Sequence, residues 1–310
     1  MTGASGFVGR NLVPALAETH QVTAVVRKPG SSVGAAREVV VPDIASEDLD
    51  WRPILAGTDV IVHLAARVHV MKDTASNPLE EFRKANTDAT MRLAQQAAEV
   101  GVRRFVFMSS IKVNGERTTG SPFTNTDPAR PVDPYGISKW EGEQAVRAVC
   151  QGQTMEPVIL RPTVIYGPGV RGNIARIAGL VRRGIPLPLG LVRNRRTMLS
   201  IGNLIAWVKL AISSDVVGSL PTLIGDPEPV STADLVRHLA EGMGKSARLV
   251  PFPVGWLRTL GRLARRGGDV ARLTEDLEVE PSIGAFAGAV VLESSADGLR
   301  SYARLIEPSA

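Results

Sequence analysis

The stretch TGASGFVG at residues 2–9 spaces three glycines, Gly3, Gly6 and Gly9, three residues apart. Glycines at this spacing suit a turn between a strand and a helix, because the bare backbone can approach a pyrophosphate at the helix N-terminus. By itself the pattern also fits a tight structural turn. Its meaning depends on whether strands and helices alternate in the chain around it.

Strands and helices do alternate through the first half of the chain. Apolar and β-branched runs predict strands, and apolar residues at helical spacing predict helices. The predicted strands are 21–27, 38–43, 58–66, 103–110 and 157–162, and the predicted helices are 12–17, 86–101 and 134–149. Such alternation is typical of a doubly wound parallel sheet, which binds ligands beyond the carboxyl ends of its strands.

We therefore expect a Rossmann-type α/β domain over residues 1–165 and a smaller α/β substrate-binding lid over 166–310, with part of 197–225 returning to the sheet. This sheet needs a strand before the glycine loop, yet only Met1 and Thr2 precede it. Its absence would leave buried N–H and C=O groups unpaired on both neighbouring strands. We expect that this strand is truncated and that the natural chain begins earlier, with an apolar run that ends at Thr2.

Composition narrows the class of protein. The 310 residues carry a net charge of +5, a mild excess that fits an anionic ligand without demanding nucleic acid. The single cysteine, Cys150, excludes an internal disulfide and favours a reducing compartment. No apolar run approaches the roughly 20 residues of a membrane span, and we see no signal peptide. We therefore expect a cytoplasmic protein. The four histidines do not cluster, so we also expect no metal site.

Tyr135 and Lys139 lie four residues apart in YGISK, on one face of a predicted helix. An ammonium group beside a phenol favours phenolate, so we expect the Tyr135 pKa to fall from about 10 toward neutral. Tyr135 would then serve as a general acid and base for a hydroxyl or carbonyl. Ser110 ends the preceding strand, where its hydroxyl could bind the same oxygen. Such a pair is common on protein surfaces; the glycine loop and the Ser109-Ser110 strand end favour the catalytic interpretation.

Two basic segments follow. Between Glu156 and Asp215 the chain has eight arginines, one lysine and no acidic residue. Arginine suits a pyrophosphate, although a solvated basic face is the alternative. Aromatic residues are scarce there, so nucleic acid is the poorer interpretation. Residues 254–268 form an amphipathic basic stretch, which we interpret as a lid helix in preference to a membrane-surface helix.

Together these motifs resemble the extended short-chain dehydrogenase/reductases of the nucleotide-sugar epimerase/dehydratase family, the UDP-glucose 4-epimerase type. The resemblance spans most of residues 2–205 and thins after about residue 250. It is carried by TGASGFVG, HLAA at 63–66, Asn86, SS at 109–110, PYGISK at 134–139, LRPTVIYGPG at 160–169 and RRTMLSIGNL at 195–204.

The resemblance implies roles for individual residues. Ser110 and Tyr135 would hold and protonate the sugar oxygen, and Lys139 would also bind the nicotinamide ribose. Asn173 and Arg196 would meet the diphosphate of a UDP-sugar. The cofactor would be lined by Gly3, Gly6, Phe7, Val8, Gly9, Asp43, Ile44, Leu64, Ala65, Ala66, Tyr135, Lys139 and Pro162. It also implies that a homodimer is possible.

The choice between NAD and NADP depends on the end of the second strand. NAD-specific sites usually carry an acidic residue there for the ribose diol. This chain has Arg27-Lys28, a positive pair that would receive a 2′-phosphate. We therefore expect Arg27 to contact the cofactor and to favour NADP, although a surface arginine at a strand end is the alternative.

The reaction is narrowed by the residues after Ser110. Family dehydratases place Asp-Glu there, and the decarboxylating branch has a glutamate, whereas this chain reads Ile111-Lys112. Epimerases often read Val-Tyr-Gly further on; here Asn114 replaces the tyrosine, which predicts a smaller and more polar wall. The runs 63–73 and 109–116 most resemble 4-ketoreductases of UDP-4-keto-6-deoxy-N-acetylhexosamines, enzymes of surface polysaccharide synthesis.

In a 4-ketoreductase, hydride would reach C4 while Tyr135 donates the proton. The alternative is a UDP-hexose 4-epimerase, which uses the same residues and retains its cofactor. A more remote alternative is an NAD(P)-sensing binding module that has lost its chemistry.

Overall fold

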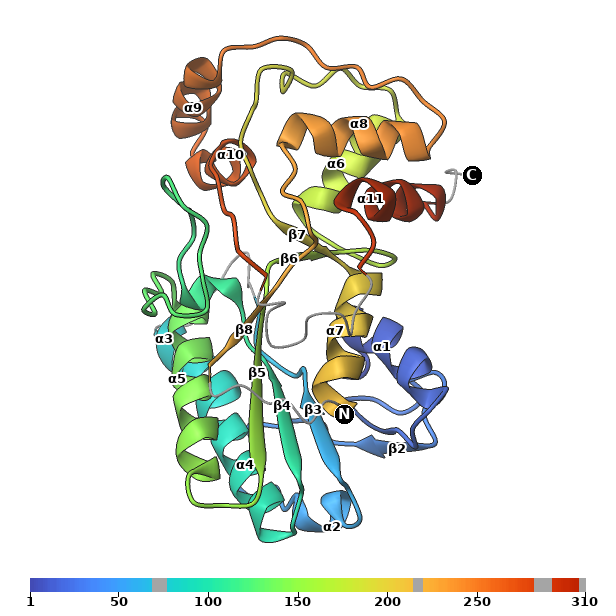
Figure 1. Ribbon diagram of the computed structural model, residues 1–310, viewed down its shortest axis with the longest axis vertical. Coiled ribbons are helices and arrows are strands. Elements are labelled where there is room, and N and C mark those ends of the chain that lie inside the picture. Colours follow the sequence, from blue (N-terminus) through green and yellow to red (C-terminus); the bar gives the residue numbers. More distant parts are fainter. Residues whose placement is uncertain (69–76, 214–219, 282–291, 307–310) are drawn as a thin grey trace.

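The computed structural model describes residues 1–68, 77–213, 220–281 and 292–306. Two halves stack along the long axis, with the strands of the main sheet in the lower half of Figure 1. The elements of the first half are α1 (Phe7–Ala17), β1 (Thr23–Val26), β2 (Arg37–Val40), α2 (Arg52–Leu55), β3 (Val60–His63), α3 (Pro78–Arg83), a π-helical turn (Lys84–Asp88), α4 (Ala89–Glu99), β4 (Arg104–Met108), a 3-10 turn (Ile111–Val113), α5 (Pro134–Cys150) and β5 (Glu156–Pro162).

The elements after β5 contribute to both halves of the molecule. They are β6 (Val164–Tyr166), α6 (Asn173–Arg182), β7 (Met198–Ser200), α7 (Ile201–Ser213), β8 (Thr222–Ile224), α8 (Thr232–Gly242), α9 (Val254–Leu263), α10 (Gly267–Thr274) and α11 (Ser295–Arg304). Strand β8 pairs with β5, and α7 packs beside α1, so α7 and β8 return to the first half.

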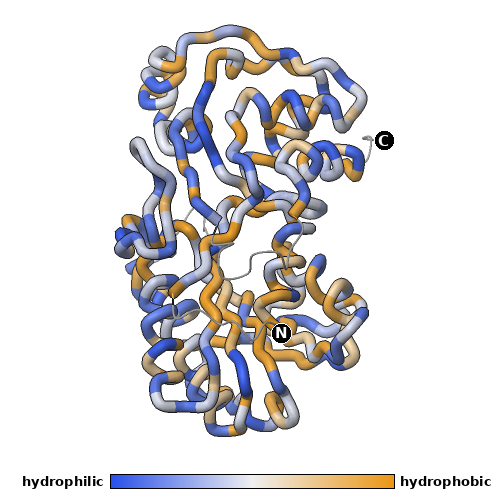
Figure 2. Tube along the Cα trace, in the orientation of Figure 1, coloured by the Kyte–Doolittle hydropathy of each residue, from blue (hydrophilic) through white to orange (hydrophobic). Residues whose placement is uncertain are grey.

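The main sheet is parallel, in the order β3-β4-β5-β8. Its strands are apolar along most of their length, as the orange tube in Figure 2 shows, because both faces are covered. One face packs against α4 and α5 and the other against α1 and α7. This arrangement confirms the predicted doubly wound α/β fold.

Met1 and Thr2 occupy the position of the expected central strand. Thr2 N–H donates to Val62 O at 3.1 Å, and Val25 N–H donates to Met1 O at 2.8 Å, so these two residues join β1 to β3. The Met1 amino group donates to Thr23 O at 2.7 Å, and its burial lowers its pKa to about 5. The prediction of an apolar run before Met1 concerns residues outside this chain and stays a prediction.

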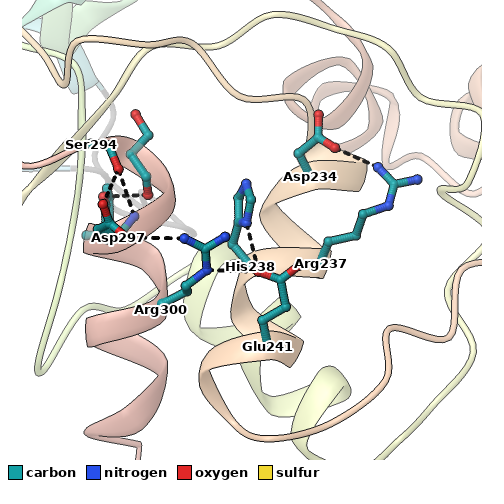
Figure 3. A network of polar contacts seen from close by, with 9 residues as sticks. Asp234, Arg237, His238, Glu241, Ser294, Asp297 and Arg300 are labelled. Atoms are coloured by element: carbon teal, nitrogen blue, oxygen red, sulfur yellow. Dashed lines mark hydrogen bonds and ion pairs between the residues drawn. The ribbon is translucent and has the colours of Figure 1, made fainter.

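The C-terminal half has its own core, where α6, α8 and α11 pack around Tyr166 and Tyr302. Figure 3 shows polar contacts on the outside of this core. Arg300 of α11 donates to Glu241 of α8 at 2.8 Å, which joins the two helices. Across the described parts of the chain, every helix is too short or too polar to cross a bilayer.

Candidate active site

The glycine loop is packed too tightly for side chains. Gly3 has a φ of +67°, and a Cβ there would lie 2.7 Å from Ala65 N. A Cβ on Gly9 would lie 2.6 Å from the Ala4 Cα, against backbone that cannot yield. Gly6 is the N-cap of α1, and no side chain caps the helix there. Helix α1 therefore presents its N-terminal N–H groups beside the sheet edge, where a pyrophosphate fits.

We expect Gly9→Ala to weaken cofactor binding. The new methyl group must push α1 away from the loop at a cost of about 1–3 kcal/mol, which would displace the N–H groups expected to hold the phosphates of the cofactor. Calorimetric titration with NAD and NADP should show a dissociation constant raised about tenfold or more. Gly57→Ala is the matched control, because a Cβ at Gly57 meets nothing within 4 Å and its φ of +73° brings only local strain. Equal affinity in Gly9→Ala and the parent protein would contradict this role.

The other predicted cofactor residues lie near the carboxyl ends of the parallel strands. Leu64, Ala65 and Ala66 directly follow β3 and are half-buried, and Pro162 ends β5 and is buried. Arg27 directly follows β1 and is exposed. Two further residues lie beyond β2: Asp43, which is exposed and accepts a hydrogen bond from Ala45 N–H at 2.9 Å, and Ile44, which is half-buried. Phe7 and Val8 begin α1 and are half-buried.

The three predicted catalytic residues come from β4 and α5. Ser110 lies beyond the end of β4, and its side chain hydrogen-bonds the Tyr135 hydroxyl. Pro134 begins α5 and the Asp133 carboxylate caps it, accepting from Gly136 N–H at 2.7 Å. One turn after Tyr135, the Lys139 ammonium lies 4.0 Å from the centre of the Phe107 ring. The hydroxyls of Ser110 and Tyr135 and the buried Lys139 therefore lie at the same end of the sheet.

The expected lowering of the Tyr135 pKa is wrong for the protein without ligands. Burial raises the pKa of Tyr135 to about 12, and the Ser110 hydrogen bond opposes that rise only in part. Burial also lowers the pKa of Lys139 to about 7, although the nearby Glu143 carboxylate favours the charged ammonium. Spacing on a helix indicates which side chains share a face, but desolvation of each group, which spacing does not indicate, dominates here.

A buried ion pair behind Ser110 was missed by the sequence analysis. Glu143 of α5 is fully buried and accepts from Arg161 of β5 at 2.8 and 2.6 Å. It also accepts from the Ser109 hydroxyl, and Arg161 donates to the Asn114 amide oxygen at 2.9 Å. These contacts fix the segment that presents Ser110 to both α5 and β5. The sequence gives little signal of this pair, because α5 has three other charged residues and β5 has one other.

Two expectations change as a result. Asn114 is only 1% exposed, so it is part of this buried network and not the polar pocket wall that was predicted. Arg161 belongs to the basic segment assigned to pyrophosphate, yet it pairs with Glu143 in the core. Arg195 of the same segment pairs with Glu278 at 2.8 Å, so acidic residues from outside the segment neutralise part of its charge.

The two predicted diphosphate contacts lie in the C-terminal half. Asn173 is the first residue of α6, and it is half-buried. Arg196 precedes β7 and donates to Glu275 O at 3.0 Å. Burial lowers the pKa of the Arg196 guanidinium, which makes it a poorly hydrated cation that an anionic ligand would stabilise. No hydrogen bond joins either residue to Ser110, Tyr135 or Lys139 in the described part of the chain.

Among the described residues, no group of three histidine, cysteine or acidic side chains could hold a metal ion. His63 is buried and bonds Thr2 at 2.7 Å and Thr90 at 3.0 Å, and its burial lowers its pKa to about 3. His238 contacts Glu241 at 3.3 Å (Figure 3). His69 and the end of the predicted 63–73 run lie outside the described residues.

Comparison with known proteins places these features in context. The model of the NAD dependent epimerase/dehydratase family matches residues 1–221. A UDP-glucose 4-epimerase of Vibrio cholerae is 41% identical over 91% of this chain and 87% of its own. The N-acetyl-alpha-D-glucosaminyl-diphospho-ditrans,octacis-undecaprenol 4-epimerase of Escherichia coli O157:H7 is 26% identical over 83% of this chain and 76% of its own.

A solved structure of MoeE5 with UDP-glucuronic acid and NAD has a similar fold. Its TM-score is 0.76 at 25% identity, and the match covers 97% of this chain and 96% of that one. A human epimerase family protein solved with NADPH has the same TM-score at 21% identity, which shows the fold alone.

Proposed function

Because the chain belongs to the NAD dependent epimerase/dehydratase family, we propose that this enzyme interconverts the C4 epimers of a UDP-sugar. The observation that carries the proposal is the contact of Ser110 with Tyr135, one helical turn from the buried Lys139. That arrangement suits proton transfer at an alcohol whose carbon exchanges a hydride. The 41% identity to the Vibrio cholerae UDP-glucose 4-epimerase supports epimerisation over the 4-ketoreductase predicted from the sequence.

Each residue has one role in the proposed reaction. Tyr135 removes the proton of the C4 hydroxyl and returns it after the 4-keto sugar has presented its other face. Ser110 holds the same oxygen, and the Lys139 ammonium stabilises the phenolate. When bound, a nicotinamide cofactor would accept a hydride from C4 and return it. The glycine loop at the start of α1 would hold the pyrophosphate of that cofactor.

The first test is conversion of UDP-glucose and, separately, of UDP-N-acetylglucosamine, followed by proton NMR. We expect one of these sugars to be converted to a mixture with its C4 epimer without added reduced cofactor. The same mixture should form when the reaction starts from that C4 epimer. Extraction of the purified protein should also release bound nicotinamide cofactor, because an epimerase must retain it between half-reactions. Conversion of neither sugar would remove the proposal.

The 4-ketoreductase remains a second candidate because Arg27 and Lys28 are exposed and suit the 2′-phosphate of NADP. A reductase would release its oxidised cofactor and bind a reduced one in each turnover. Its test is stoichiometric oxidation of reduced cofactor by a UDP-4-keto-6-deoxy-N-acetylhexosamine, with a 6-deoxy sugar as product. Cofactor binding without turnover of any UDP-sugar would favour the sensing module. The name of the Escherichia coli relative gives a lipid-linked sugar diphosphate as its substrate. The same chemistry on such a substrate would require an enzyme that works at a membrane surface.

We expect Arg27→Asp to shift cofactor preference toward NAD. The exposed guanidinium at the end of β1 attracts a 2′-phosphate, whereas a carboxylate repels it and accepts from the ribose diol. The ratio of the NADP and NAD dissociation constants should change by about tenfold or more, which corresponds to about 1.4 kcal/mol. Arg37→Asp, an exposed arginine at the start of β2, is the control. An unchanged ratio would place Arg27 outside the cofactor site.

A further inference from the structure

Helix α9 exposes an apolar stripe. Trp256 is 65% exposed, Leu260 49% and Leu263 77%. Their spacing of four and then three residues puts them on one face of the helix. On another face Gly261 is buried, and a Cβ there would lie 2.5 Å from Val270 of α10. The helix is therefore attached through Gly261 and through Val254 and Leu257, which pack on the core of the C-terminal half, while Trp256, Leu260 and Leu263 face solvent.

The charge around this stripe has one sign. Residues 254–268 contain four arginines and no acidic residue. The four are exposed, and no carboxylate of the described residues forms an ion pair with any of them: Arg258, Arg262, Arg265 and Arg266. The stripe and these arginines are together called the α9 surface.

The backbone keeps one of these cations at a strained position. Helix α9 ends in a turn in which Arg266 N–H donates to Gly261 O at 2.7 Å, and Arg265 has a φ of 54°. Glycine favours this left-handed position, because a Cβ is strained there. Gly267 and Gly268 follow directly, yet the strained position holds an arginine. This turn places Arg265 and Arg266 shortly after Leu263, the last residue of the stripe.

We propose that the α9 surface docks on a bilayer that contains anionic phospholipids. Trp256, Leu260 and Leu263 enter the boundary between headgroups and acyl chains, and the arginines contact lipid phosphates. A small phosphorylated ligand would use the cations but leave the stripe exposed, whereas a membrane surface uses both. Figure 1 shows α9 at an outer corner of the C-terminal half, away from the main sheet, with α10 on its inner side. The expected packing of 254–268 on the domain holds for Val254 and Leu257, which contact the core of the C-terminal half. The stretch is not a single helix, however, since it divides between α9 and α10 and exposes Trp256, Leu260 and Leu263.

The test is sedimentation of the full chain with vesicles of phosphatidylcholine alone or mixed with phosphatidylglycerol. We expect binding to the mixed vesicles only, weakening as salt is raised. Tryptophan emission should shift to shorter wavelength on binding, and the shift should vanish in Trp256→Phe. Trp51 and Trp207 are buried and Trp140 is 38% exposed on α5, so Trp256 should dominate this signal.

Variants separate docking from folding and from catalysis. Leu260→Glu/Leu263→Glu should abolish vesicle binding, whereas Leu305→Glu, at a residue 64% exposed on the end of α11, should not. Arg262→Gln and Arg266→Gln should each weaken binding about fivefold. All variants should keep the UDP-sugar conversion of the parent protein without vesicles. Failure to bind mixed vesicles at low salt would overturn the proposal. A change from dimer to monomer in the double variant would also overturn it, because the stripe would then be a subunit contact.

Discussion

Replacing Tyr135 with phenylalanine is expected to lower the turnover of a UDP-sugar about 10³-fold. General acid and base catalysis is worth about 10²–10⁴ in rate, and Tyr135 is the hydroxyl that can both take and return a proton beside Ser110. The ring and the packing of α5 are kept, so the dissociation constants of cofactor and substrate should change little. Turnover is measured by NMR of the sugar, and binding by calorimetry.

Tyr302→Phe is the matched control, since Tyr302 is a buried tyrosine of α11 in the core of the C-terminal half. It should keep the turnover of the parent protein. If Tyr135→Phe kept more than about a tenth of that turnover, another group would have to move the proton, and the role given to Tyr135 would be wrong.

Replacing Lys139 with methionine is expected to abolish turnover and, at the same time, to stabilise the protein without ligands. Lys139 is 1% exposed, and burial lowers its pKa from 10.5 to about 7. Between these two pKa values the unfolded chain binds a proton that the folded chain does not. The free energy of unfolding therefore rises with pH across this window, and the full cost of the buried charge is present below pH 7.

Methionine removes that cost and fills much the same volume. At pH 7 we expect a gain on the order of 3 kcal/mol, or about 5 °C in melting temperature. The difference between variant and parent should shrink as pH rises toward 10. Lys112→Met, which removes a half-exposed lysine paired with Asp133, should not raise the melting temperature. A less stable Lys139→Met protein would show that the contact with Phe107 outweighs desolvation.

The sequence predicted the first half of the fold well, because its signals are local. Three closely spaced glycines, short β-branched runs and the Asp133-Pro134 start of α5 each report on a few neighbouring residues, and all agree with one topology. Helix α9 was less predictable. Its apolar stripe has the same helical period whether it is buried or exposed, and only the structure shows that Trp256 and Leu263 face solvent.

The candidate site divides in the same way. Motif and helical spacing predict that Ser110, Tyr135 and Lys139 share one site. The Glu143–Arg161 pair was hidden because its partners lie on different elements, and their charges gave no sign of burial. The pKa of Tyr135 was misjudged for a related reason, since desolvation is set by everything packed around a group.

The most direct test of the account is proton NMR of UDP-glucose and UDP-N-acetylglucosamine in D₂O with the parent protein. We predict that the C4 epimer of one sugar appears with its C4 hydrogen retained, because hydride leaves and returns within the site and is never exchanged with solvent. Deuterium at C4 would contradict this mechanism. If neither sugar were converted, the proposed epimerase function itself would be wrong.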